Sequence, residues 1–351
     1  MKEKSFYFQW HITDLCNFRC RHCYQSNFSS QSDLDLEGLK KIADNILSVL
    51  KYWNKRAIIN ITGGEPLLKQ ELFPLLEYLD HQKAVKELAV ITNASILDRN
   101  VADRLANIKK LDEVKISLEG ATESSNDAIR GKGAFKKALA ALKLLKPHKN
   151  IEKTIMFTML RRNLSEVNRL LELAEENGAN GVILERFIPW GRGQAIKAEV
   201  LSREEWSGAV NRLLQFLEIP FSKEIFSYKA FWVRFGKTAP QLFGAPCVAA
   251  DGGVCIMPNG DVYPCRRFNL KIGNLLQNRL DEIYNGSEVL KDLQQRGKLK
   301  GKCNDCVIKS CKGCRALVYA TTGDYLGEDI QCFYERGEFV PPRKKRENSL
   351  R

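Results

Sequence analysis

Eleven cysteines are the side chains of this 351-residue chain best suited to chemistry. Thiolates bind soft metals such as zinc and the iron of iron–sulfur clusters. Three of the cysteines lie close together near the amino terminus, eight lie in the last third, and the long stretch between them has none. An odd number of thiols in a chain without a signal-peptide pattern is poorly explained by disulfides. We therefore expect metal centres at both ends of a cysteine-free scaffold.

The first three thiols belong to Cys16, Cys20 and Cys23. On so short a loop they can converge on one metal centre, but they leave a fourth ligand missing. Structural zinc sites are normally closed by four protein ligands, so a set of three favours an open, catalytic position. The alternative is a structural zinc site completed by His11 or His22.

The first 217 residues alternate between strand and helix patterns. Apolar segments rich in β-branched or aromatic residues predict strands at 6–11, 57–62, 88–92, 114–118, 155–159 and 182–187. Helical periodicity predicts helices at 34–53, 72–83, 98–109, 133–146, 164–177 and after 202. This order predicts an α/β fold with a parallel sheet, in which catalytic residues gather at the carboxyl ends of the strands.

The rest of the chain has a different composition. Residues 218–246 are aromatic-rich and are expected to form an irregular bridge packed on the first domain. A hairpin is predicted at 254–265 around an Asn-Gly turn, followed by a helix near 279–297. Few aliphatic residues follow, so we expect metal to form the core of this part. The expected domains are thus 1–217, the bridge 218–246, 247–335 and a basic tail, 336–351.

Composition excludes several classes of protein. The chain is 44% hydrophobic and 28% charged, which is typical of a globular protein. It has no apolar run of about 18 residues that could span a membrane, and we expect a cytoplasmic protein. The net charge of +13 would suit a zinc-bound nucleic-acid module. However, residues 343–351 supply +4 of it and the rest is dispersed, so nucleic acid is a disfavoured partner.

The loop from Cys16 to Cys23 resembles the CxxxCxφC motif of radical S-adenosylmethionine (SAM) enzymes, with His22 at the aromatic position. Gly63-Gly64-Glu65-Pro66, after the second predicted strand, is similar to the GGEP element of this family. Thr92-Asn93 and Ser117-Leu118-Glu119-Gly120 follow the next two strands in the expected order. The resemblance covers residues 6–217 and implies a partial (βα)6 barrel related to the TIM barrel.

The resemblance also implies roles for these residues. Cys16, Cys20 and Cys23 would hold a [4Fe–4S] cluster with one iron free for SAM, which is split into methionine and a 5′-deoxyadenosyl radical. The remaining positions would bind SAM, with His22 at its motif position, Gly63, Gly64 and Glu65 at the ammonium, Ser117 and Glu119 at the ribose, and Arg130 at the carboxylate. The same residues could instead form a plain turn at Gly63–Pro66, helix caps at Ser117 and Glu119, and a surface ion pair at Arg130.

The carboxyl-terminal cysteines resemble the SPASM extension of radical SAM enzymes, a Cys-rich α+β domain. The resemblance implies two fully ligated auxiliary [4Fe–4S] clusters, one on Cys247, Cys255, Cys265 and Cys314, the other on Cys303, Cys306, Cys311 and Cys332. Three and twice four account for all eleven cysteines. Two structural zinc sites are the alternative. In the sulfatase-maturing branch an acidic residue acts as a base after the cysteine at position 265, whereas this chain has Arg266 and Arg267, which disfavours that function.

The resemblance implies an enzyme that abstracts hydrogen from its substrate. We expect maturation of a ribosomally made peptide or protein by crosslinking, epimerisation or oxidation. The alternative is maturation of a small-molecule cofactor of the haem, tungsten/molybdenum or quinone type. A flavodoxin or ferredoxin would donate electrons. Because no peptide-recognition domain precedes residue 6, a leader peptide would need a separate binding protein.

Overall fold

The computed structural model describes residues 4–236 and 238–335, and its first half is built on six parallel strands. Each strand lies within a few residues of its predicted position. The strands are β1 (Lys4–His11), β2 (Lys55–Thr62), β3 (Val85–Thr92), β4 (Leu111–Ser117), β5 (Glu152–Met159) and β6 (Gly181–Arg186).

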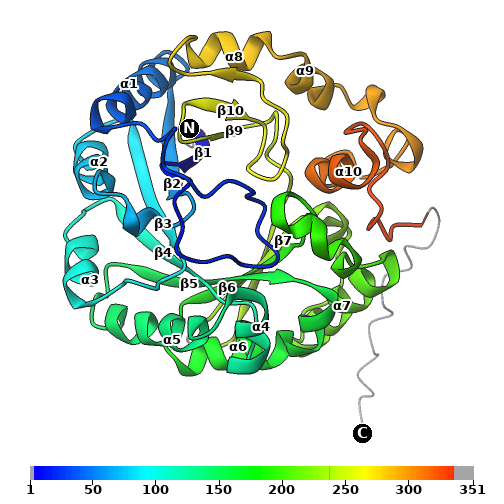
Figure 1. Cartoon of the computed structure of the whole chain (residues 1–351). Coiled ribbons are helices and arrows are strands. Elements are labelled where there is room, and N and C mark those ends of the chain that lie inside the picture. The colour runs from blue at the N-terminus through cyan, green and yellow to red at the C-terminus, as the bar shows by residue number, and fades with distance from the viewer. Residues whose placement is uncertain (1–3, 237, 336–351) are drawn as a thin grey trace, which may run out of the picture.

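Helices connect these strands and lie on the outside of the sheet (Figure 1). They are α1 (Leu36–Tyr52), α2 (Leu72–Asp80), α3 (Arg99–Ala106), α4 (Glu123–Arg130), α5 (Ala134–Leu145), α6 (Val167–Glu176) and α7 (Arg203–Phe216). The predicted βα order is confirmed, but α4 was not predicted. Its sequence, ESSNDAIR, has almost no apolar stripe, and the helix begins instead at a capping box made by Thr122 and Ser125.

The six strands are the middle of an eleven-stranded sheet with the order β11-β10-β9-β1-β2-β3-β4-β5-β6-β7-β8. Figure 1 shows this sheet curving around a central space, across which the loop after β1 runs. The bridge was wrongly expected to be irregular, because it contributes β7 (Ala230–Arg234) and β8 (Gln241–Ala245), antiparallel strands that continue the sheet beyond β6. Strand β8 lies at the edge and is mostly exposed, so it lacks the buried alternation that identifies a strand in a sequence.

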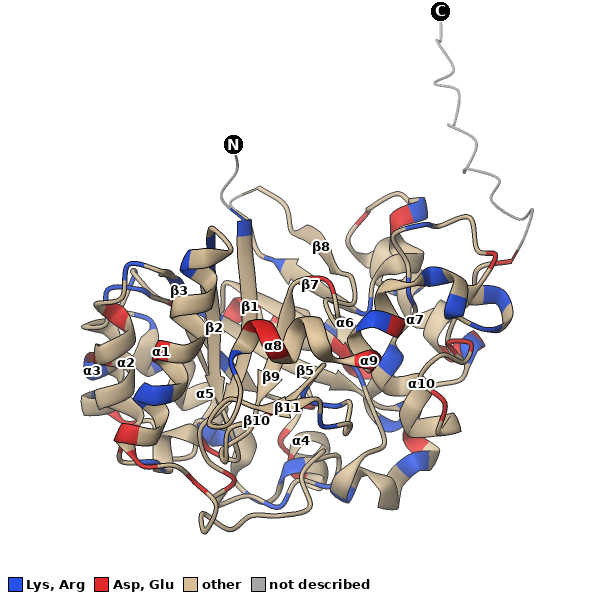
Figure 2. Cartoon of the chain, turned by 90° about the horizontal axis from the view of Figure 1, so that it is seen from above, with Lys and Arg blue, Asp and Glu red and all other residues tan. Residues whose placement is uncertain are grey.

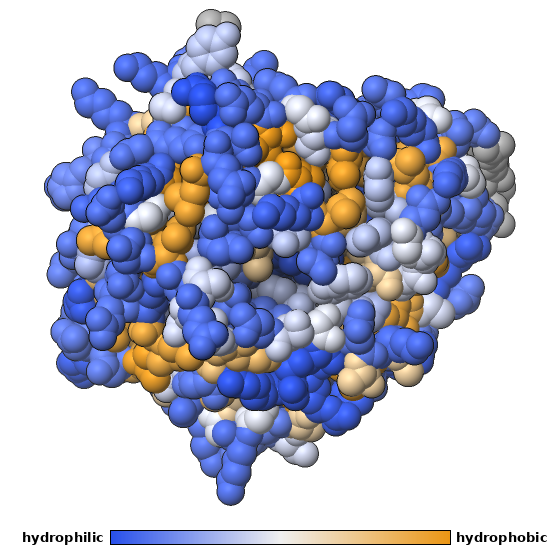
Figure 3. Space-filling view, turned by 45° about the horizontal axis from the view of Figure 1, so that its top comes forward, coloured by the Kyte–Doolittle hydropathy of each residue, from blue (hydrophilic) through white to orange (hydrophobic). Residues whose placement is uncertain are grey.

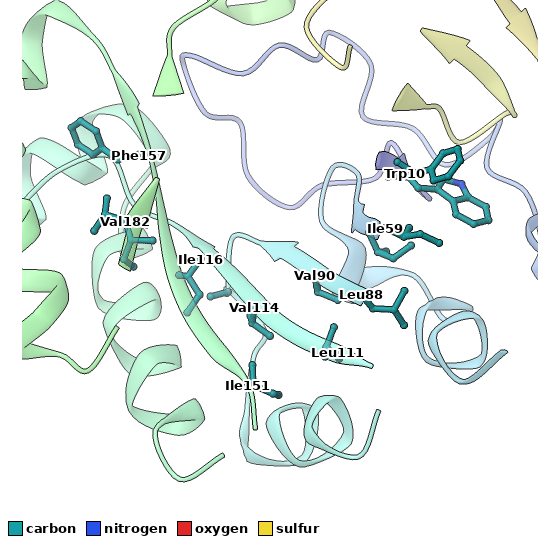
Figure 4. Close-up of a cluster of buried hydrophobic side chains, with 14 of the residues drawn as sticks. Trp10, Ile59, Leu88, Val90, Leu111, Val114, Ile116, Ile151, Phe157 and Val182 are labelled. Carbon is teal, nitrogen blue, oxygen red and sulfur yellow. The ribbon is translucent and has the colours of Figure 1, made fainter. Parts of the chain in front are cut away.

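The main hydrophobic core lies between the sheet and its helices. Phe6, Phe8 and Trp10 of β1 pack there with apolar residues of α1 and the neighbouring strands. Figure 4 shows Trp10, Ile59, Val90 and other members of this core together with the strands that carry them. Alternate residues of a strand point to opposite faces, so the intervening positions are left to line the interior of the partial barrel.

The carboxyl-terminal part begins with the predicted hairpin, β9 (Gly253–Ile256) and β10 (Asp261–Tyr263). Strand β9 pairs in parallel with β1, which joins this part to the first strand of the barrel. The remaining elements are β11 (Gly273–Asn274), α8 (Leu280–Gly286), α9 (Glu288–Gln294) and α10 (Arg315–Thr322). The expected single helix is therefore two. A small apolar core around Phe268, Leu290 and Leu317 also exists here, so metal is not the only source of cohesion.

A buried ion pair ties the end of β6 to the carboxyl-terminal part. Arg186 Nη1 lies 2.9 Å from Asp329 Oδ2, and the same oxygen accepts a hydrogen bond from the backbone N–H of Cys314. Burial alone would raise the pKa of Asp329, but Arg186 and Lys229 outweigh it and lower this pKa to about 2. The pair therefore stabilises the folded protein above the usual aspartate pKa, 3.8, and that stabilisation is lost as the pH falls toward 2.

We expect Asp329→Asn to lower the free energy of unfolding by about 3 kcal/mol at neutral pH, since it leaves the charge of Arg186 buried without its partner. Chemical denaturation followed by circular dichroism measures this loss. Asp324→Asn is the matched control, because Asp324 pairs with Lys300 at the surface and such pairs contribute less than about 1 kcal/mol. Equal losses in the free energy of unfolding of both variants would contradict a stabilising role for the buried pair of Arg186 and Asp329.

The charged side chains and the hydropathy of the helices can be followed in the structure. Lys and Arg alternate with Asp and Glu over the elements in the view of Figure 2, without a single basic face in that view. Among the residues that the structure describes, no helix is long and apolar enough to cross a membrane. The expected basic tail, 336–351, lies outside the described residues.

Candidate active site

A cleft at the carboxyl ends of the parallel strands brings most of the predicted site residues together. It encloses about 870 Å³ between protein atoms, part of which is open to solvent. Figure 3 shows a surface hollowed near its middle, with a largely hydrophilic rim. The predicted residues that line the cleft are Cys16, Cys20, His22, Cys23, Gly63, Gly64, Ser117, Glu119 and Arg130. Glu65 does not belong to the lining.

The three thiols of the first loop face this cleft. Burial raises the pKa of all three, that of Cys20 to about 12, and the neighbouring thiols of Cys16 and Cys23 add to the shift at Cys20. Asn93 Nδ2 lies 3.8 Å from the sulfur of Cys16, and Arg130 Nη1 lies 3.9 Å from that of Cys20. A metal centre supplies positive charge that favours the ionised form of buried thiols, so the set fits a cationic centre.

Gly63 and Gly64 hold the cysteine loop against the end of β2. The backbone N–H of Gly64 donates to Thr13 O at 2.8 Å, and that of Glu65 donates to Leu15 O at 2.8 Å. A Cβ atom on Gly64 would lie 2.3 Å from Leu15 O, and one on Gly63 would lie 2.3 Å from Thr13 O. The glycines therefore permit a close approach of two backbones. A plain turn, the alternative considered from the sequence, would not need that approach.

Glu65 is buried and accepts three hydrogen bonds. Its Oε1 accepts from the Thr92 hydroxyl at 2.7 Å and from the Leu67 N–H at 3.1 Å, and its Oε2 accepts from the Asn93 N–H at 2.6 Å. Burial raises its pKa to about 7 despite these hydrogen bonds. Glu65 thus links the ends of β2 and β3, and after burial its carboxylate also contributes to the raised pKa of Cys16, a thiol of the cleft.

Glu119 and Arg130 form a buried ion pair within the cleft wall. His22 Nε2 lies 3.5 Å from the second oxygen of Glu119, and burial lowers the pKa of His22 to about 4, so this imidazole is neutral. Helix α4, which follows β4, is capped by Thr122. Ser117 and Glu119 therefore do not have the capping role that was considered for them. The alternative for Arg130 was a surface ion pair, but its pair with Glu119 is buried, and its Nη1 lies 3.9 Å from the thiol of Cys20.

The sequence analysis did not predict that Arg266, Arg267 and Glu185 would lie together in the cleft. Arg266 makes a short ion pair with Glu185 Oε2, and Arg267 Nη2 lies 3.3 Å from Glu185 Oε1. Burial alone would raise the pKa of Glu185, but the two arginines lower it below its usual value. The position of Glu185 at the end of a predicted strand was the available signal, whereas the pairing joins residues about 80 positions apart.

The structure places the carboxyl-terminal cysteines in two groups. The first group lines one pocket and consists of Cys303, Cys306, Cys311 and Cys332. In the second, burial raises the pKa of Cys247 to about 11, and the nearby thiols of Cys314 and Cys265 raise it further. Cys255 is fully buried on β9, and Cys265 is the thiol that adds to its raised pKa.

Cations surround the group that lines the pocket. Lys229 Nζ lies 3.4 Å from the sulfur of Cys311, and Arg315 Nη2 lies 3.8 Å from that of Cys303. Arg296 donates to backbone carbonyls of this loop, at Cys303, Cys306, Ile308, Lys309 and Cys311. One guanidinium therefore fixes the backbone of three of the four cysteines.

We expect Arg296→Gln to release this loop and to lower the iron content of the reconstituted protein by about four atoms per chain. A single amide cannot replace a guanidinium that reaches five carbonyls. Iron and acid-labile sulfide measure the effect. Arg279→Gln removes an arginine from an exposed pair with Asp281 and is the matched control. Full iron content in Arg296→Gln would show that the loop assembles without it.

The three groups of cysteines are recognised because their members line the same pocket or influence one another's pKa. Across residues 4–236 and 238–335, no three His, Cys, Asp or Glu side chains converge tightly enough to hold a single metal ion as they stand. All eleven cysteines are free thiols.

Comparison with known proteins identifies the class that this fold and cleft define. Residues 10–174 match the radical SAM superfamily, and residues 247–315 match SPASM, an iron–sulfur cluster-binding domain. The pre-heme d1 synthase of Dinoroseobacter shibae is 30% identical over 94% of this chain and 86% of its own. The chain belongs to the radical SAM superfamily. More narrowly, it is one of its members with a carboxyl-terminal SPASM domain, which implies SAM and iron–sulfur clusters as cofactors.

Other relatives of similar identity carry names of two different activities, heme synthesis and mycofactocin maturation. The AdoMet-dependent heme synthase of Methanosarcina barkeri is 29% identical over 94% of this chain and 96% of its own. The mycofactocin maturase MftC of Mycolicibacterium smegmatis is 29% identical over 92% of this chain and 81% of its own.

Solved structures share the fold. Streptococcus suis SuiB bound to its precursor peptide SuiA has a TM-score of 0.71, with 16% identity over 95% of this chain and 76% of its own. The enzyme anSMEcpe with bound AdoMet has a TM-score of 0.72, with 19% identity over 93% of this chain and 90% of its own. The predicted fold, a partial radical SAM barrel with a SPASM domain, is confirmed.

Proposed function

We propose that the chain cleaves SAM reductively at a [4Fe–4S] cluster held by Cys16, Cys20 and Cys23. The observation that carries the proposal is the placement of three thiols from one loop in the cleft at the carboxyl ends of β2, β3 and β4. Three thiolates leave one iron of such a cluster without a protein ligand, which is the position that SAM requires. The burial of these thiols also favours a cationic centre over free thiolates.

The cleft residues have separate tasks in this proposal. Gly63 and Gly64 fix the cysteine loop, and Arg130 offers a guanidinium to the carboxylate of SAM. Ser117 and Glu119 offer oxygen acceptors to the ribose hydroxyls. When bound at the cluster, SAM supplies a 5′-deoxyadenosyl radical that abstracts hydrogen from the substrate.

The domain boundaries at 217, 246 and 335 remain part of the proposal, with two auxiliary clusters in the last domain. The pocket of Cys303, Cys306, Cys311 and Cys332 supports one cluster. The mutual influence of Cys247, Cys265 and Cys314 supports the other, and Cys255 completes it. Full cysteine ligation leaves no iron open to SAM, so these clusters carry electrons or support the substrate pocket.

For the substrate, we place a small-molecule cofactor of the tetrapyrrole type first. The heme synthase of M. barkeri aligns over nearly its whole length, and the arginines of the cleft suit an anionic substrate. Peptide maturation is the second candidate, supported by the alignment with a mycofactocin maturase. A leader peptide would then come with a separate binding protein. In either case a flavodoxin or ferredoxin would deliver the electron, in the reducing cytoplasm, where free thiols persist.

The test is anaerobic incubation of the reconstituted protein with SAM and a reductant, followed by chromatography. We expect 5′-deoxyadenosine and methionine in equal amounts, from a brown protein with iron near twelve atoms per chain. A colourless, zinc-containing protein that leaves SAM intact would refute the proposal.

A further inference from the structure

We infer that Arg266 and Arg267 form a subsite for a carboxylate group of the substrate, an inference that rests on the proposed function. Both arginines follow Cys265 directly, and both side chains line the same cleft as the first cysteine loop. They lie at the opposite end of the sequence from that loop. The cleft is therefore completed by two cations that the carboxyl-terminal domain supplies.

Two guanidinium groups share a single carboxylate here. Glu185 is the one carboxylate that pairs with either arginine among the described residues, and it is shared between them. The other two arginines of the cleft are neutralised elsewhere, Arg186 by Asp329 and Arg130 by Glu119. Thiols also lie near the two arginines, Cys255 near Arg266 and Cys265 and Cys314 near Arg267, but Glu185 is the carboxylate that the two guanidinium groups share. An anion that enters the cleft would find its counter-charge here.

The donors are also not fully used. Arg267 Nη1 donates to the Arg186 carbonyl at 2.9 Å, but Arg267 Nε is buried without a hydrogen-bond partner in the described part of the chain. A buried donor without an acceptor costs free energy. A planar guanidinium binds a carboxylate through two parallel N–H bonds, which would satisfy such a donor. The side chains of Arg266 and Arg267 are only 9% and 18% exposed, so water weakens such an interaction little.

The neighbouring side chains favour an organic carboxylate over a small inorganic anion. The guanidinium of Arg266 lies 5.6 Å from the ring centre of Tyr24, which itself lines the cleft. Phe187 and Met156 add apolar surface to the same walls. A carboxylate on a larger, partly apolar body matches this combination. The side chains of a tetrapyrrole and an acidic residue of a peptide both present that chemistry.

The test uses benzoate as the probe, with its neutral isostere benzamide, in anaerobic equilibrium dialysis against the reconstituted protein with SAM. We expect benzoate to bind and benzamide not to bind. Arg267→Gln and Arg266→Gln should each weaken benzoate binding roughly tenfold, the loss expected for one charge-assisted hydrogen bond.

Glu185→Gln should have the opposite effect. It removes the carboxylate that competes for both arginines, so benzoate should bind more tightly. A variant that merely disturbs the fold would weaken binding instead. Arg169→Gln, which removes an arginine paired with two glutamates on the exposed face of α6, is the matched control and should not change the affinity. Absence of benzoate binding, or equal binding by wild type and Arg267→Gln, would overturn the inference.

A second arm distinguishes the two sources of the carboxylate. Haem is compared with its dimethyl ester by absorbance titration, and a glutamate-containing peptide with its glutamine counterpart by dialysis. A preference for the free carboxylate that Arg267→Gln abolishes supports the subsite and identifies its source. Equal binding of all four probes to both proteins counts against it. Failure of wild-type protein to form 5′-deoxyadenosine would refute the proposed function alone, because benzoate binding is measured without turnover.

Discussion

Replacing Cys20 by alanine should reduce the formation of 5′-deoxyadenosine to the background rate without enzyme. Two thiolates cannot hold a four-iron cluster with a single open iron, so the site that binds SAM is lost. The iron content should fall by about four atoms per chain, with a matching loss of sulfide. Liquid chromatography and iron analysis of the same anaerobic sample measure both effects.

Cys306→Ala provides the matched comparison, since it removes a thiol from the pocket of the carboxyl-terminal domain. It should also lose about four iron atoms. However, the change that SAM produces in the electron paramagnetic resonance (EPR) spectrum of the reduced protein should persist in this variant and disappear in Cys20→Ala. The reverse pattern would show that SAM binds at the carboxyl-terminal cysteines instead.

Gly64→Ala should have the second-largest effect, although it adds only one methyl group. That Cβ would lie 2.3 Å from Leu15 O and 2.6 Å from Asp14 O, both backbone atoms of the cysteine loop. The loop must move, and a displacement of about 1 Å at a reacting centre can cost a hundredfold in rate. We expect about that loss in 5′-deoxyadenosine formation, with secondary structure unchanged by circular dichroism.

Gly286→Ala is the control for this substitution. A Cβ there meets nothing within 4 Å, and the glycine is exposed at the end of helix α8. Alanine at that position should leave the rate of SAM cleavage unchanged. If Gly64→Ala were as active as Gly286→Ala, the close backbone contact would not be what positions the cysteine loop.

The sequence predicted the barrel and its cysteine loop because both depend on local patterns. Alternating apolar segments identified β1 to β6, and the spacing of Cys16, Cys20 and Cys23 needed no knowledge of tertiary structure. Helix α4 and strand β8 escaped prediction, because one depends on a capping box and the other lies exposed at a sheet edge. In both, the apolar periodicity that carries the signal is weak.

In the candidate site, too, local motifs were predicted from the sequence, whereas contacts between distant residues were not. The GGEP element was found at the right place, but the function of Glu65 within it depends on the hydroxyl of Thr92 and the N–H of Asn93, which come from another strand. Likewise, Arg266 was recognised only as a departure from an acidic residue. Its pairing with Glu185 spans 81 positions and follows from the way the last domain closes on the barrel.

The most direct test of SAM binding at the first cysteine loop is electron–nuclear double resonance on the reduced protein with SAM labelled by ¹⁵N at its amino group. A cluster held by Cys16, Cys20 and Cys23 predicts a ¹⁵N coupling that is present in the wild type and absent from Cys20→Ala. A cluster that shows no coupling to the labelled nitrogen, with SAM present in excess, would contradict it.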